Sequence, residues 1–99
     1  MKVVEELDAG PVMHQAKIVI NENTDTQTLI QVLSQLGAKA LLDSISKIEN
    51  AEAKFKEQNH NQATYAKKIG KAEGKIKWNE SAKKILAKIN GLNPNPGAW

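Results

Sequence analysis

The chain has 99 residues, of which 40% are hydrophobic and 4% aromatic, so its length fits one domain with a modest core. No apolar run approaches the roughly 20 residues of a membrane span, and acids stand where a secretory signal would be apolar, so we expect a cytoplasmic protein. The absence of cysteine excludes disulfides, thiolate catalysis and Cys-ligated metal sites, while 14 lysines without any arginine give a net charge of +3.

Two short segments near the start predict β-strands. The first covers residues 2–7, and the second covers residues 12–20, where alternate side chains fall on opposite faces. Gly10-Pro11 lies between them and favours a turn or a strand break. We therefore expect a β-hairpin, which needs a covering helix or further strands because a lone hairpin is barely stable in water.

A long amphipathic helix is predicted from about residue 26 to residue 49. Its apolar residues recur at three- and four-residue steps, which is the strongest periodic signal in the chain. They are Leu29, Val32, Leu33, Leu36, Ala40, Leu41, Ile45 and Ile48. Thr24, Asp25 or Thr26 is the expected N-cap. Gly37 lies near the middle, where it either costs about 1 kcal/mol relative to alanine or marks close packing against a neighbour.

The rest of the chain is strongly basic. Residues 53–99 hold ten lysines against three acids, whereas residues 1–52 hold four lysines against eight acids. The amide-rich run at 58–62 predicts a surface loop, and the glycines at 70 and 74 bound a short turn or one-turn helix. A short second helix is expected from Asn79, as N-cap, to a stop at Asn90-Gly91.

A lysine-rich surface suits phosphate groups, although an ordinary solvated lysine face has the same composition. Because lysine lacks the fork of donors that arginine offers, we expect any RNA contact to go mostly to the backbone and to be weakly sequence-specific. Tyr65 and Trp78 flank the basic turns, where they either stack on RNA or anchor this segment to the protein body.

Few side chains indicate chemistry by position alone. Asp8 lies at a predicted strand end, a place that suits either a catalytic carboxylate or a turn-forming aspartate. His14 and His60 lack the paired spacing of a metal site, so no metal is expected. No serine lies on the sharp strand-to-helix elbow that a serine nucleophile requires.

Five short motifs occur in the order in which one enzyme family carries similar ones. They are Leu-Asp-Ala-Gly-Pro at 7–11, Asp-Thr at 25–26 followed by Leu-Gly-Ala at 36–38, Thr-Tyr-Ala-Lys-Lys-Ile at 64–69, Gly-Lys-Ile-Lys-Trp at 74–78 with Ser-Ala at 81–82, and Asn-Pro-Asn-Pro-Gly-Ala at 93–98. Together they resemble the methionyl-tRNA formyltransferase family over nearly the whole chain. Other folate-dependent formyltransferases share the first motif, whereas the third and the last point more narrowly to this family.

The resemblance implies transfer of the formyl group of 10-formyltetrahydrofolate to the amino group of methionine on initiator tRNA, in translation initiation. Of the family's catalytic Asn, His and Asp, only the Asp has a counterpart, Asp8, because the Asn-x-His motif lies upstream in the family. We therefore expect a fragment that is inactive by itself and binds no folate alone. An N-terminal formyltransferase segment that complements the chain is a candidate partner.

The implied architecture is α+β, in which the hairpin belongs to the edge of a Rossmann-like formyltransferase sheet and the long helix covers it. Residues 1–52 would form the C-terminal part of the catalytic domain, and residues 53–99 a basic linker leading to a β-barrel domain absent from the chain. Exposed strand edges and apolar surface then predict marginal stability or self-association. The tRNA-contact candidates are the linker lysines Lys67, Lys68, Lys71, Lys75 and Lys77.

Three positions depart from the family pattern. Lys77 stands where the family has Asp, Asn90 where it has Arg, and Asn95 where it has Trp. Loss of a guanidinium and of a large aromatic side chain weakens the expected docking of the linker. Two alternatives stay open: a small basic RNA-binding module without catalysis, and a fragment of another folate-dependent formyltransferase, for example one acting on a sugar amine.

Overall fold

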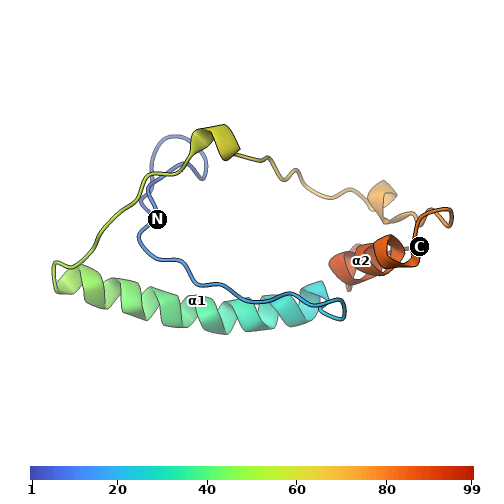
Figure 1. Cartoon of the computed structure of the whole chain (residues 1–99), viewed down its shortest axis with the longest axis horizontal. Coiled ribbons are helices and arrows are strands. Elements are labelled where there is room, and N and C mark those ends of the chain that lie inside the picture. The colour runs from blue at the N-terminus through green and yellow to red at the C-terminus, as the bar shows by residue number, and fades with distance from the viewer. The chain divides into compact units, whose positions relative to one another are not determined.

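The computed structural model describes all 99 residues and contains two α-helices and two short 3-10 helices (Figure 1). Their order is α1 (Thr26–Glu49), η1 (His60–Gln62), η2 (Lys71–Gly74) and α2 (Ala82–Leu92). The chain divides into two compact units: a first unit of Met1–Lys17 with Gln35–Ala66, and a second unit of Ile18–Ser34 with Lys67–Trp99. The N-terminal part of α1 therefore belongs to the second unit and its C-terminal part to the first.

The predicted β-hairpin is wrong, because residues 2–7 and 12–20 form no strand. The carbonyl of Pro11 accepts a hydrogen bond from the Lys2 N–H at 2.9 Å, but the proline nitrogen carries no hydrogen to extend a ladder. Val12 instead makes an isolated antiparallel bridge with Lys56, through two hydrogen bonds of 2.9 Å each. Pairing with a residue far along the chain therefore replaces pairing between the two neighbouring segments.

The α+β class and the Rossmann-like sheet edge are corrected with the hairpin, since the structure has helices, turns and loops but no sheet. Strand propensity measures how well a side chain fits a pleated, half-buried surface. Here Val3 is 98% exposed and Val19 89% exposed, so no such surface covers either segment. Residues 12–20 have alternating polar and apolar side chains, but no neighbouring strand pairs with them, so they do not form a strand.

The long helix is confirmed over its whole length, because α1 covers the residues that the apolar spacing predicts. Asp25 is the N-cap among the three candidates, since its Oδ1 accepts the Thr28 N–H at 2.8 Å. Thr24 closes the preceding turn, where its Oγ1 accepts the Asn21 N–H at 3.2 Å. A Cβ added at Gly37 would meet no atom within 4 Å outside its own helix turn, so in this structure Gly37 marks no close packing.

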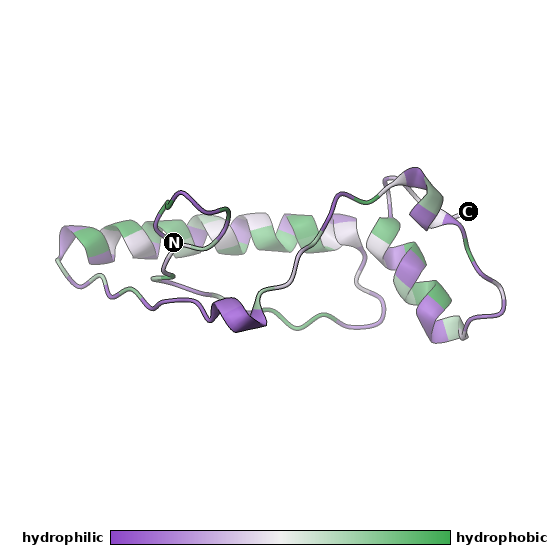
Figure 2. Cartoon of the chain, turned by 90° about the horizontal axis from the view of Figure 1, so that it is seen from above, coloured by the Kyte–Doolittle hydropathy of each residue, from purple (hydrophilic) through white to green (hydrophobic).

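Much apolar surface of α1 is exposed. One row of its residues is half-buried: Leu29, Leu36, Ala40, Ser44 and Lys47. A second row is between 43% and 60% exposed: Ile30, Leu33, Leu41, Ile45 and Ile48. Hydrophobic residues recur along the helix in Figure 2.

The apolar surface that the sequence led us to expect is therefore present, and Leu92 is the one buried apolar side chain, with 8% exposure. With so little buried area, hydrophobic burial contributes little to stability. Marginal stability and self-association stay predictions. Neither helix has the length and apolar content that crossing a membrane requires.

The second helix begins later than the sequence predicts. Ser81, rather than Asn79, is the N-cap of α2, since its Oγ accepts the Lys84 N–H at 3.4 Å. Residues 77–80 instead close a turn in which the Glu80 N–H donates to the Lys77 carbonyl at 3.0 Å. Asn and Ser are comparable N-caps, so residue preference alone did not separate the two positions.

The end of α2 also differs from the predicted stop at Asn90-Gly91, because the helix continues to Leu92. The Leu92 carbonyl accepts the Gly97 N–H at 2.9 Å, and Gly97 has φ of +79°, which glycine adopts without steric cost. The final residue, Trp99, then donates its N–H to the Gly74 carbonyl at 2.9 Å. Gly74 ends η2, which confirms the short turn predicted between the glycines.

Three side-chain hydrogen bonds of 2.7 Å join the start of α1 to the end of α2 inside the second unit. Thr26 Oγ1 donates to the Gly91 carbonyl, and Asn90 Nδ2 donates to the Glu22 carbonyl. Asn93 Nδ2 donates to Asp25 Oδ2. We call these three bonds the junction. Asn90, one of the departures from the family pattern, is thus an ordered part of it.

The junction should weaken in acid. Hydrogen bonds from the side chain and backbone of Thr28, followed by the one from Asn93, hold the pKa of Asp25 below its ordinary value. A carboxyl with a lowered folded pKa stabilises the fold above its unfolded pKa of about 3.9, and this contribution is lost as pH falls through the lower folded pKa. We expect the Asn93 side-chain amide NMR signals to move toward those of a free amide as pH is lowered through that window.

In the variant Asp25→Asn, this acid-dependent change should disappear. The matched variant Asp43→Asn, at an exposed carboxylate of α1 that makes no hydrogen bond, should keep it. An Asn93 signal that does not change between neutral pH and pH 2 in the unmodified chain would count against a contribution from Asp25.

Candidate functional site

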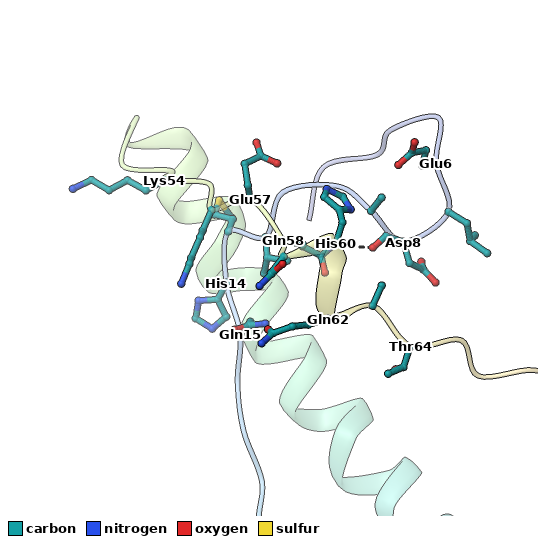
Figure 3. A pocket seen from close by; sticks show the side chains of 17 residues that line it. Glu6, Asp8, His14, Gln15, Lys54, Glu57, Gln58, His60, Gln62 and Thr64 are labelled. Carbon is teal, nitrogen blue, oxygen red and sulfur yellow. Dashed lines mark hydrogen bonds between the residues drawn. The ribbon is translucent and has the colours of Figure 1, made fainter.

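A hollow of about 940 Å³ opens beside Asp8 in the first unit (Figure 3). Its lining comes from two stretches, residues 6–15 and 54–64. They bring together three carboxylates, two amines and two imidazoles around a surface that is polar and apolar in nearly equal parts. The sequence-predicted catalytic residue, Asp8, lies on this lining and its side chain is exposed.

The backbone around Asp8 is held in an unusual conformation. Asp8 has φ of +54°, in the left-handed region that residues with a Cβ seldom occupy. Gln58 Nε2 donates to the Asp8 carbonyl at 2.7 Å, drawn as a dashed line in Figure 3, and to the Gly10 carbonyl at 2.8 Å. Gly10 is buried against the carbonyl of Lys2, where any Cβ would overlap that oxygen. We call residues 8–10 the Asp8 turn. Its main chain is held in place by these contacts, whereas the Asp8 carboxylate itself makes no hydrogen bond.

The second stretch of the lining is anchored on both sides of Gln58. Two residues before it, Lys56 forms the bridge with Val12. Next to Lys56, the ring of Phe55 lies under the ammonium group of Lys2, with Nζ 4.5 Å from the ring centroid. Directly after Gln58, Asn59 caps η1 by accepting the Asn61 N–H at 3.1 Å. The predicted amide-rich loop is thus an ordered turn.

The two histidines, which sequence spacing did not connect, both line the hollow. His14 comes from the first stretch and His60 from η1. No group of three or more His, Asp or Glu side chains is arranged to hold a metal ion. The sequence also missed Gln58, because a single amide inside a polar run carries no signal of a contact 50 residues away.

The lysines predicted to contact tRNA all lie in the second unit and are exposed: Lys67, Lys68, Lys71, Lys75 and Lys77. They are not equivalent. Lys75 Nζ lies 5.8 Å from the centroid of the Trp99 ring, whereas the other four make no ion pair or cation–π contact. The one ion pair of the chain joins Lys83 to Glu22 at 2.9 Å, and both side chains are largely exposed. This unit holds eight lysines against four acids.

The two aromatic residues near these lysines are also exposed. Tyr65 is 86% exposed and Trp78 is 79% exposed. The two alternatives for these rings, stacking on RNA and anchoring the basic segment to the protein body, stay predictions.

Sequence comparison connects these features to known enzymes. Over all 99 residues, the chain is 43% identical to methionyl-tRNA formyltransferase of Pelagibacter ubique, 41% to that of Sulfurihydrogenibium sp. and 38% to that of Bartonella henselae. The chain is homologous to methionyl-tRNA formyltransferase along its whole length. The family "Formyl transferase, C-terminal domain" matches residues 68–99. The resemblance drawn from the five sequence motifs is thus confirmed.

The chain spans about a third of the length of these relatives, 32% in each case. It is therefore homologous to one part of a methionyl-tRNA formyltransferase. The division into a catalytic part at residues 1–52 and a linker at residues 53–99 stays a prediction.

Proposed function

We propose that the chain supplies part of the catalytic site and part of the tRNA-binding surface of an enzyme that formylates methionyl-tRNA. In this proposal 10-formyltetrahydrofolate is the formyl donor and initiator methionyl-tRNA the acceptor, and the reaction takes place in the cytoplasm. Residues 1–52 contribute the C-terminal part of the catalytic domain, and residues 53–99 form a basic linker whose residues 68–99 match the family of the C-terminal domain. Homology over all 99 residues supports this assignment.

The observation that carries the proposal is the exposed carboxylate of Asp8 at the edge of the hollow. In formyl transfer the amino nitrogen of methionine attacks the formyl carbon, and the bond from that carbon to the folate nitrogen then breaks. The attacking amine loses a proton, and the folate nitrogen gains one. A carboxylate that makes no other hydrogen bond is free to accept that proton, directly or through a water molecule.

A carboxylate is insufficient for the whole reaction. The tetrahedral intermediate carries an oxyanion, which needs fixed hydrogen-bond donors. In the methionyl-tRNA formyltransferase family, which this chain resembles, an Asn and a His act beside the catalytic Asp. We propose that a complementing N-terminal formyltransferase segment supplies this Asn and this His. The folate then binds between that segment and this chain, and the chain by itself binds no folate and is inactive.

The test is formylation of methionyl-tRNA with 10-formyltetrahydrofolate, by the chain alone and by the chain mixed with the N-terminal formyltransferase segment of the Pelagibacter ubique relative. We expect no turnover from either part alone and measurable turnover from the mixture. Turnover by the chain alone at a rate near that of a complete enzyme would contradict the expected inactivity. No turnover from a mixture whose two parts bind each other would contradict the proposed function.

A further inference from the structure

The side chain of Gln58 connects two carbonyls of the Asp8 turn to a distant segment. Its Nε2 donates to the Asp8 carbonyl at 2.7 Å and to the Gly10 carbonyl at 2.8 Å. The two hydrogens on Nε2 can each serve one of these carbonyls, and the sulfur of Met1, 3.9 Å from Nε2, is a longer and weaker acceptor. Gln58 is half-buried, although its neighbours on both sides are exposed.

The Asp8 turn needs an external support. With φ of +54°, Asp8 occupies a region that is sterically unfavourable for a residue with a Cβ, so the free backbone would favour another conformation. The direction of the Asp8 carboxylate follows from this backbone conformation. Two hydrogen bonds from Gln58, to the carbonyls on either side of Ala9, oppose relaxation of the turn, beside the bond from the Lys2 N–H to the Pro11 carbonyl.

Gln58 is itself held in place. The Val12–Lys56 bridge fixes the backbone two residues before it, and the Asn59 cap of η1 fixes the backbone directly after it. A side chain on such a supported segment can position its partner more accurately than one on a free loop. Gln58 touches only the main chain of the Asp8 turn, so it acts on Asp8 without a contact to the carboxylate.

We propose that Gln58 is a positioning residue that holds the Asp8 turn in its left-handed conformation and thereby keeps the Asp8 carboxylate at the edge of the hollow. The catalytic consequence of this inference rests on the proposed function, whereas its structural part does not. A residue outside the predicted catalytic part, residues 1–52, thereby completes the turn that carries the candidate catalytic group.

The structural part is tested by NMR on the 99-residue chain at neutral pH. The variant Gln58→Glu keeps the shape of the side chain but removes both donors. Gln58→Lys keeps a donor of similar reach, and Gln62→Glu makes the same charge change in a side chain of the same hollow that makes no hydrogen bond. The readouts are the sign of φ at Asp8, from three-bond couplings and intraresidue NOEs, and the hydrogen exchange of the Val12 and Lys56 amides.

In Gln58→Glu, the positive φ of Asp8 should be lost while the Val12 and Lys56 amides stay protected. In Gln58→Lys and Gln62→Glu, the positive φ should remain. A positive φ that persists in Gln58→Glu would overturn the proposal. Equal loss of protection at Val12 and Lys56 would also overturn it, because Gln58 would then support the whole segment rather than the turn.

The catalytic part is tested in the mixture with the N-terminal segment. We expect Gln58→Glu to lower kcat by about tenfold to a hundredfold with little change in the KM for methionyl-tRNA. The variant Gln58→Lys, which keeps a donor, should retain most of the kcat of the unmodified chain. Gln31→Glu, on the exposed surface of α1, is the matched control. If Asp8→Asn leaves the rate unchanged, the proposed function fails, and the NMR result still decides the role of Gln58 in the turn.

Discussion

Replacing Asp8 with asparagine is expected to lower formylation by the mixture about a hundredfold to ten-thousandfold. The amide has the size of the carboxylate but cannot accept a proton at neutral pH. The fold of the turn should survive, because Gln58 binds the carbonyl of Asp8 rather than its side chain. Asparagine also tolerates the left-handed conformation that Asp8 adopts. The measurement is kcat and KM for transfer of a labelled formyl group.

The control for this prediction is Asp43→Asn, which removes the same charge from the surface of α1. Its rate should stay within about twofold of the unmodified chain, as surface changes usually do. NMR of Asp8→Asn should still show the Val12–Lys56 bridge. A rate for Asp8→Asn close to that of the control would exclude Asp8 from proton transfer.

Neutralising Lys67, Lys68 and Lys71 together, each by glutamine, is expected to weaken binding of initiator tRNA roughly a hundredfold at about 0.1 M salt. Each lysine that neutralises a phosphate releases a counterion, so the slope of log affinity against log salt should fall by about one for each lysine removed. These three ammonium groups are exposed and make no ion pair. Lys75 should contribute less, because it already lies over the Trp99 ring. Fluorescence anisotropy across a salt series provides the measurement.

The matched variant changes Lys17, Lys39 and Lys47 of the acidic part of the chain to glutamine. It loses the same net charge, but its slope should stay near that of the unmodified chain, since these lysines lie outside the basic residues 53–99. Equal slopes for the two triple variants would show that tRNA responds to overall charge rather than to this surface. Affinity of the unmodified chain that barely falls with salt would contradict contacts between lysine and phosphate.

Local patterns were sufficient for α1 and for the presence of α2, although both bounds of α2 differ from the prediction, and they were insufficient for the strands. In α1 the apolar spacing and the cap at Asp25 act within a few residues, so the sequence predicted both bounds. A strand needs a partner, and here Val12 pairs with Lys56, far along the chain, while Pro11 has no N–H for a ladder. The alternation of polar and apolar residues alone does not show whether a segment has a pairing partner or the N–H groups that a ladder needs.

The sequence also predicted only part of the candidate site. Asp8 was found because it lies in a motif that resembles a family, and the structure places it at the hollow. The role of Gln58 was not predictable, because its two acceptors are backbone carbonyls. Any residue type offers such a carbonyl, so the sequence at positions 8 and 10 does not specify the partner. The difference between the lysines, likewise, depends on where Trp99 lies.

The junction in the second unit should respond less to ionic strength than the binding of tRNA to the lysines does. All three of its donors are uncharged side chains, and two of its acceptors are backbone carbonyls. Dissolved ions screen the attraction between exposed charges far more than they weaken a short hydrogen bond between neutral groups. Rising salt should therefore release tRNA from the lysines while the end of α2 stays attached to the start of α1. A brief salt wash could then strip bound RNA during purification and leave this part of the fold in place.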